Sequence, residues 1–224
     1  MSNIKYIIVS SPKYSLARES LVYSLKINNI DMEDVFIVCN NSNDRFIDLK
    51  SSPINVNLNL NLYEYSFFLG VSDLLDGGLV KKNDSFILLH DTCICGISFK
   101  KTVENVINKY KNMDIIYSNN SGQFNIGIFR YKAIMYGSKA WSNIVYLSKQ
   151  DAINLEHGCS VELSPSRWVA NNLKVFYPRH GCSFVGIKDI YEDGHIREIS
   201  HIYFLDLYKY FYMVWDGFHP NSAG

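Results

Sequence analysis

Residues 85–93, Ser-Phe-Ile-Leu-Leu-His-Asp-Thr-Cys, join a short apolar run to a polar end. A run of this kind is typical of a strand that is buried on both faces of a parallel sheet. Asp91 follows that strand directly, at the edge where open α/β sheets bind their ligands. The segment therefore predicts both an α/β fold and a ligand site at the end of one of its strands.

Alternating strands and helices extend from this segment in both directions. Ile4–Ser10 and Val35–Cys39 are apolar runs that predict two more buried strands, with a helix between them. Apolar residues alternate with Asn over residues 54–62, which predicts a half-exposed strand near an edge. Helices are also predicted over 65–75, 98–111, 133–146 and from Ser164, and strands over 114–117 and 124–129. We therefore expect an open, mostly parallel, twisted sheet that is flanked by helices.

The last third of the chain is less regular. Residues 178–194 show no clear periodicity, and residues 201–215 are apolar and aromatic over about four helical turns. We expect a C-terminal aromatic helix over 201–215. It could pack in the core or form the interface of a homodimer, and docking on a membrane surface is the alternative.

The composition excludes several classes of protein. The 224 residues include 22 basic and 22 acidic side chains, so the formal net charge is zero and no basic field favours nucleic acid. No apolar run approaches the roughly 20 residues that cross a bilayer, and the first ten residues lack the regions of a signal peptide. We expect a cytoplasmic single domain whose five cysteines are free thiols.

Two readings of the polar residues compete at the sequence level. Asp91 could hold a divalent ion on a diphosphate, because Mg²⁺ and Mn²⁺ bind carboxylate and phosphate oxygens, or it could cap a turn. The repeat His-Gly-Cys-Ser at 157–160 and 180–183, taken with Cys93 and Cys95, raises the alternative of a zinc site. Their spacing is atypical of a zinc knuckle, so we favour chance recurrence.

The motifs resemble the nucleotide-sugar-dependent glycosyltransferases of the GT-A fold, in which an Asp-x-Asp motif or a shortened variant follows such a strand. The resemblance covers the opening strand and helix (6–30), the second strand (35–41) and Leu-Leu-His-Asp-Thr at 88–92. Residues 124–130, Phe-Asn-Ile-Gly-Ile-Phe-Arg, look like the strand that bears Asn-x-Gly and faces the acceptor. Cys93 stands where the family has its second aspartate.

The resemblance implies a Rossmann-like nucleotide-sugar-binding half over 1–97 and an acceptor-side half over 98–200. It implies donor contacts from Val9, Ser10, Ser11, Arg18, Asn40, Asp73, His90, Asp91 and Arg179. Asp91 would hold Mn²⁺ or Mg²⁺, with His180 as a second ligand. The family commonly places its catalytic base before a late helix, where Glu162 is the first candidate and Glu156 and Asp151 are alternatives.

The implied activity is the transfer of a sugar from a nucleotide diphosphate, with UDP as the first candidate, to a hydroxyl of a carbohydrate or glycolipid acceptor. An alternative of another class is a non-catalytic nucleotide-binding or interaction module. Such a module would have kept the sheet and lost the second acidic metal ligand, as Cys93 would suggest. Donor hydrolysis without acceptor separates the two, because only an enzyme can leak sugar to water.

Overall fold

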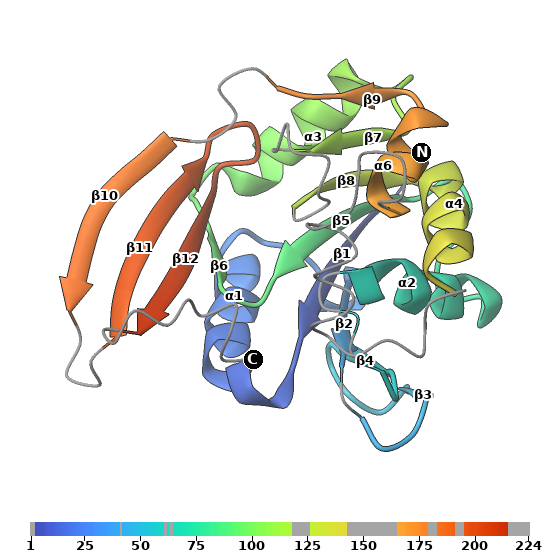
Figure 1. Ribbon diagram of the computed structural model, residues 1–224, viewed down its shortest axis with the longest axis horizontal. Coiled ribbons are helices and arrows are strands. Elements are labelled where there is room, and N and C mark those ends of the chain that lie inside the picture. The colour runs from blue at the N-terminus through green and yellow to red at the C-terminus, as the bar shows by residue number, and fades with distance from the viewer. Residues whose placement is uncertain are drawn as a thin grey trace.

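The computed structural model describes residues 3–40, 42–60, 62, 65–117, 126–142, 165–178, 183–190 and 195–214. Within these ranges the chain forms a large sheet with helices on both faces and a small sheet to one side (Figure 1). The strand order of the large sheet is β3-β4-β2-β1-β5-β8-β7-β9. The small sheet has the order β10-β11-β12-β6.

The strands of the large sheet are short, and most of them run in the same direction. They are β1 (Ile4–Ser10), β2 (Val35–Cys39), β3 (Phe46–Asp48), β4 (Ile54–Asn57), β5 (Ser85–His90), β7 (Ile115–Tyr117), β8 (Gly127–Arg130) and β9 (Val175–Phe176). Only β3 and β8 pair antiparallel with their neighbours among these strands. The predicted fold class, an open and mostly parallel α/β sheet, is confirmed.

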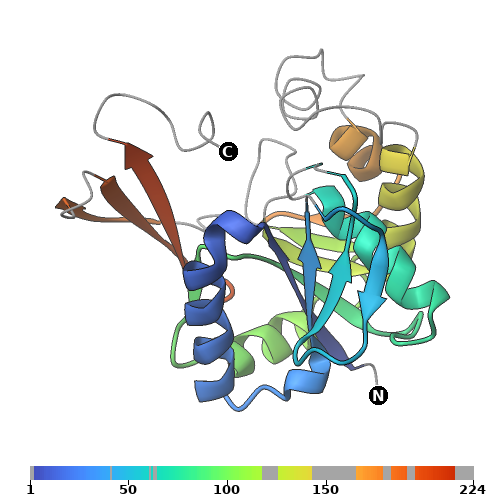
Figure 2. The ribbon, with the colours of Figure 1, turned by 90° about the horizontal axis from the view of Figure 1, so that it is seen from below.

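Helices cover both faces of the large sheet because every second strand residue points to the opposite face. They are α1 (Ser15–Ile27), α2 (Ser66–Asp76), α3 (Phe99–Lys109), α4 (Tyr131–Ser142) and α6 (Pro165–Asn171), with single 3-10 turns η1 (Pro12–Tyr14) and η2 (Met32–Asp34). Ile7 and Val9 of β1 face the core beneath α2, α4 and α6, whereas Tyr6 and Ile8 face the core beneath α1 and α3. Figure 2 shows α1 and α4 on opposite sides of the sheet.

Aromatic side chains join α2 and α4 to the sheet. The ring of Phe68 lies edge-on to that of Phe129 of β8, with a centroid distance of 5.6 Å. Gly137 of α4 lies so close to Phe68 that a Cβ there would be 2.1 Å from the ring. Tyr65 and Trp141 stack at 4.2 Å. These contacts fix the start of α2 and the whole of α4 over one face.

The C-terminal part of the chain differs from the prediction. Residues 201–215 were expected to form an aromatic helix, but β11 (His195–Ile202) and β12 (Leu207–Val214) form an antiparallel hairpin there. β10 (Ser183–Ile190) also lies in the stretch expected to be irregular, and β6 (Cys93–Cys95) completes the small sheet. Aromatic and β-branched residues favour strands once partner strands are present, and a local pattern cannot show those partners.

The turn between β11 and β12 is pinned to the start of α3. Asp206 adopts a φ of 53°, a conformation that Asp tolerates better than most residues. Its carboxylate accepts a hydrogen bond of 2.8 Å from the backbone N–H of Ser98 and lies 3.0 Å from Nε2 of His201. No helix in the described residues is both long and apolar enough to cross a membrane.

The order of the strands creates a switch point beside β1. The chain passes from β1 outward to β2 and β4 on one side, and α2 then returns it to β5 on the other side of β1. In sheets of this kind the connections diverge at such a point and leave a crevice at the carboxyl ends of the strands. The switch lies between the ends of β1 and β5.

Candidate active site

The predicted donor-site residues gather at the carboxyl ends of β2, β1 and β5. Ser10 is paired in register with Cys39, and Val9 with His90. Asn40 and Asp91 each follow the last residue of a strand. Residues from three adjacent strands therefore meet at the switch point.

Hydrogen bonds hold the ends of β1 and β2 together. The backbone N–H of Asn40 donates to the carbonyl of Ser10 at 3.0 Å, and the Ser10 hydroxyl donates to the carbonyl of Ser11 at 3.4 Å. Ser10 and Asn40 are both buried, and Ser11 is half-buried. This end of the site presents hydroxyl and amide groups, which recognise ribose and base by hydrogen bonding.

Arg18 supplies a positive charge beside these strand ends. It lies in the first half of α1, is half-buried, and lowers the pKa of the Cys39 thiol, although burial has the larger effect and raises that pKa. Its contact with the donor stays a prediction. A guanidinium here suits the phosphate oxygens of a nucleotide.

His90 and Asp91 place an imidazole and a carboxylate at the end of β5. His90 is the last residue of β5, and Asp91 begins the turn that leads from the large sheet into β6 of the small sheet. Both are buried, with 8% and 4% of their surface exposed, and Nδ1 of His90 lies 3.9 Å from Oδ1 of Asp91. A carboxylate at the end of the central strand is held between the two sheets.

Cys93 and Lys209 lie next to Asp91. Lys209 of β12 is buried and is paired in register with Cys93 of β6. Burial raises the pKa of the Cys93 thiol to about 12, against the opposing charge of Lys209 and together with that of Asp91. The thiol is therefore protonated near neutral pH, which makes it a weak nucleophile.

Lys209 did not emerge as a site residue from the sequence. The sequence predicts a helix over 201–215, which contains this residue, whereas the structure puts Lys209 on a strand opposite Cys93. No local signal gives the pairing between β12 and β6, because more than a hundred residues separate the two strands along the chain. A buried lysine close to Asp91 is therefore a finding of the structure.

Two tyrosines lie at the carboxyl ends of β7 and β9, on the same edge of the sheet as Asp91. Tyr117 ends β7 and is fully buried, and its hydroxyl donates to that of Tyr177 at 2.9 Å. Tyr177 follows β9 and keeps 37% of its surface exposed. Gly127 lies beside Tyr117, and a Cβ there would be 2.7 Å from the Ile116 carbonyl oxygen. The Asn-x-Gly segment thus reaches the edge that carries the other candidates, although Asn125 lies outside the described residues.

Asp73 of α2, which was predicted to contact the donor, forms an ion pair with Arg45. Its carboxylate accepts two hydrogen bonds from Arg45, of 3.0 Å from Nε and 2.6 Å from Nη2. Arg45 directly precedes β3, the outermost strand on that side. The structure therefore places Asp73 in an ion pair with the residue before β3, and its contact with the donor stays a prediction.

The proposed catalytic carboxylates and two further candidates lie outside the described residues. These are Asp151, Glu156, Glu162, Arg179 and His180. Cys39, Cys93 and Cys95 are free thiols, as predicted. The part of the chain that the structure describes holds no group of three or more His, Cys, Asp or Glu residues close enough to share a metal ion.

Comparison with known proteins gives a distant structural similarity. No protein-family model matches the sequence, and no curated protein sequence matches it either. A solved structure that is similar to this chain is that of a glycosyltransferase involved in the glycosylation of the major capsid of PBCV-1. The TM-score is 0.39 at 10% sequence identity, over 79% of this chain and 95% of the other. A similarity this distant assigns neither family nor activity, and the functional argument therefore rests on the site.

Proposed function

We propose that this chain is a glycosyltransferase that moves a sugar from a nucleotide diphosphate, with UDP as the first candidate, to a hydroxyl of a carbohydrate acceptor. One observation carries the proposal. The buried carboxylate of Asp91 lies at the switch point, beside strand ends that present Ser10 and Asn40. A fold of this class hosts many activities, so the chemistry of these side chains is what supports this one.

The nucleoside would lie over the ends of β1 and β2. Backbone groups of Val9 and Ser11 and the side chains of Ser10 and Asn40 are suited to hydrogen-bond the base and ribose. Arg18 would approach the phosphates from α1, because a planar guanidinium matches phosphate oxygens. The diphosphate would then point toward β5 and reach the neighbourhood of Asp91.

Sugar transfer requires the negative charge on the leaving diphosphate to be stabilised. The acceptor oxygen attacks the anomeric carbon, the bond from that carbon to the diphosphate oxygen breaks, and the nucleoside diphosphate leaves with the electron pair. Asp91 supplies the hard oxygen that Mn²⁺ or Mg²⁺ prefers, and such an ion commonly uses one or two carboxylates together with substrate phosphates. The ion, when bound, would neutralise the leaving diphosphate.

The acceptor would enter from the half of the sheet that carries Tyr117 and Tyr177. The half-exposed ring of Tyr177 offers a flat apolar surface, and its hydroxyl is held by Tyr117. In an inverting enzyme a carboxylate takes the acceptor proton, and Glu162 remains our first candidate for that base, before Glu156 and Asp151. His180 remains the proposed second metal ligand, and Arg179 a proposed phosphate contact.

A non-catalytic nucleotide-binding module is the second candidate. The observation that favours it is Cys93, which occupies the third place of Asp91-Thr92-Cys93 as a buried, protonated thiol. A thiol is a softer ligand than the carboxylate oxygens that Mn²⁺ and Mg²⁺ prefer. Such a module would bind the nucleotide without turnover.

A two-stage experiment tests the proposal. First, UDP, GDP, CMP and TDP are each added with and without Mn²⁺ while the melting temperature is measured, because a ligand of the native state stabilises it by mass action. Second, the sugar nucleotide of the best base is incubated without acceptor. A Mn²⁺-dependent shift with one nucleoside diphosphate, followed by slow release of free sugar, supports the glycosyltransferase. Binding without release supports the module, and no shift with any nucleotide contradicts both.

A further inference from the structure

A cavity opens at the opposite edge of the large sheet, where β1 and β5 begin. It has a volume of about 320 Å³, and four cationic side chains from three segments of the chain line it: Lys82, Lys111, Arg130 and Lys132. Ser85, the first residue of β5, is paired in register with Arg130, the last residue of β8. The cavity therefore lies a full strand length away from Asp91, which follows the other end of β5.

Arg130 forms the inner wall of this cavity. Its guanidinium donates hydrogen bonds to the hydroxyl of Ser85 and, at 3.4 Å, to the carbonyl of Ile107 near the end of α3. Its Nε is buried and has no hydrogen-bond partner among the described residues. Burial also lowers the pKa of this guanidinium. No carboxylate in the described part of the chain forms an ion pair with it, so a half-buried guanidinium without a direct ionic partner lines the cavity.

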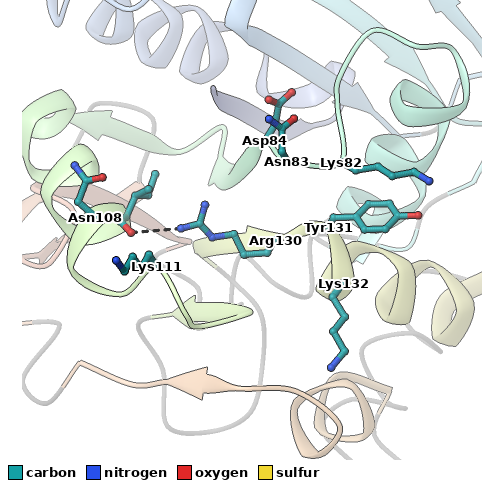
Figure 3. A pocket seen from close by; sticks show the side chains of 9 residues that line it. Lys82, Asn83, Asp84, Asn108, Lys111, Arg130, Tyr131 and Lys132 are labelled. Carbon is teal, nitrogen blue, oxygen red and sulfur yellow. Dashed lines mark hydrogen bonds between the residues drawn. The ribbon is translucent and has the colours of Figure 1, made fainter. Parts of the chain in front are cut away.

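The three lysines surround this arginine and are all exposed or nearly so. Lys82 precedes β5, and its ammonium lies 5.3 Å from the centre of the Tyr131 ring. Figure 3 shows Lys82 and Lys132 on opposite sides of Tyr131, and the Arg130 guanidinium directed toward Asn108 and Lys111. Tyr131 and Lys132 are the first residues of α4, whose first turn carries no acidic residue. The positive end of a helix therefore adds to the field of the four cations.

One carboxylate lines the same cavity. Asp84 is buried, and its Oδ2 accepts a hydrogen bond of 2.8 Å from the backbone N–H of Lys81. That carboxylate is therefore occupied within its own turn. Four positive side chains against one negative side chain leave a clear excess of positive charge in the cavity.

We propose that this cavity is a binding site for the phosphate group of a small phosphorylated molecule. An arginine fork and lysine ammoniums are the groups that proteins use to hold phosphate, through short, charge-assisted hydrogen bonds. The volume is at the lower end of the range for small-molecule pockets and exceeds what one phosphate fills. A body of the size of a sugar therefore fits beside the phosphate. The site is distinct from the proposed donor site, because the two lie at opposite edges of the sheet.

The test titrates the full-length, isotope-labelled chain with inorganic phosphate and, separately, with glucose 1-phosphate, and follows the backbone amide signals by NMR. EDTA is present to remove divalent ions, and sodium chloride at matched ionic strength is the blank. The backbone signals of Lys111, Tyr131 and Lys132 are expected to shift in a saturable manner. Those of Ser10 and Asn40, at the other edge, are expected to stay in place. Absence of saturable shifts around α4, or equal shifts with chloride, overturns the proposal.

Variants show whether the lysines hold the ligand. The double variant Lys82→Gln with Lys132→Gln is expected to weaken phosphate binding by about tenfold or more, because each lost charged hydrogen bond is worth about that much. Both lysines are exposed, so the fold tolerates the change. Lys139→Gln is the matched control, because Lys139 is an exposed lysine of the same helix outside the cavity. Equal affinity in the double variant and the control overturns the proposal.

The two ligands identify the source of the phosphate. Tighter binding of glucose 1-phosphate than of inorganic phosphate supports a site for a phosphorylated organic molecule. Equal or weaker binding of glucose 1-phosphate supports a site for free phosphate. Either order of affinity supports recognition of the phosphate group itself.

Discussion

The two edges of the large sheet are built from the same strands and carry opposite chemistry. At the carboxyl ends of β2, β1 and β5 lie buried hydroxyl, amide and carboxylate groups from Ser10, Asn40 and Asp91. At the other ends of β5 and β8 lie exposed lysines around a half-buried arginine. The first set is suited to orient a ligand through fixed hydrogen bonds, and the second to attract negative charge. The fold thus separates a proposed reaction site from a proposed phosphate site by the length of a strand.

The largest effect is expected from removing the Asp91 carboxylate at the carboxyl ends of the strands. Asp91→Asn is expected to lower kcat/KM for sugar transfer by at least about a hundredfold, equivalent to ~2.7 kcal/mol of transition-state stabilisation. It should leave phosphate binding unchanged in the cavity where β1 and β5 begin. Asp76→Asn is the control, because Asp76 is an exposed carboxylate at the end of α2. Steady-state assays of both variants check this, and wild-type activity in Asp91→Asn would contradict the mechanism.

The second largest effect is expected from widening the gap between β7 and β8, on the side where the acceptor would bind. Gly127→Ala places a methyl group where a Cβ would lie 2.7 Å from the Ile116 carbonyl oxygen and 2.7 Å from Cβ of Tyr117. Because backbone and a buried ring both resist movement, we expect a loss of about 1–3 kcal/mol in the free energy of unfolding. Urea denaturation measures it. An unchanged midpoint would show that β7 and β8 can separate without cost.

A smaller effect concerns the thiols beside Asp91. Burial raises the pKa of Cys93 and of Cys95 from 9.0 to about 12. The folded state therefore holds these protons more tightly than the unfolded chain, so their contribution to stability is complete below about pH 9 and is lost as the pH rises toward 12. The loss of unfolding free energy between pH 8 and pH 10.5 should be smaller in Cys93→Ala than in the wild type. Identical losses in the two proteins would mean that Cys93 ionises freely.

The smallest effect is expected at Asp73. Its ion pair with Arg45 is partly exposed, so Asp73→Asn should change the free energy of unfolding by no more than about 1 kcal/mol. Nucleotide affinity should stay nearly the same, since the Asp73 carboxylate already pairs with Arg45. A marked loss of nucleotide affinity, measured by calorimetry, would show that Asp73 contacts the donor directly.

The sequence predicts the first half of the fold well, for a local reason. The continuous apolar runs of β1, β2 and β5 indicate buried parallel strands without knowledge of their partners. The polar residues after those strands then indicate the site, because topology brings the carboxyl ends together. Asp91 was predicted in this way, whereas Ser10 and Asn40 were implied by the family resemblance.

The features that the sequence misses depend on contacts between distant segments. The aromatic residues of β12 fit either a helix or a strand, and pairing with β11 and β6 decides between them. Lys209 reaches Cys93 only through that pairing. The basic cavity draws Lys82, Lys111, Arg130 and Lys132 from four elements or their ends, so no motif marks it.

The most direct test of the central claim is to locate the nucleotide by paramagnetic NMR. UDP is added to the labelled chain with Mn²⁺, which broadens the amide signals close to it, and Mn²⁺ alone is the reference. We expect UDP-dependent broadening at Ser10, Asn40 and Asp91, with no change at Tyr131 and Lys132. Broadening confined to Tyr131 and Lys132, or no UDP-dependent broadening at all, would contradict the assignment of the carboxyl edge as the donor site.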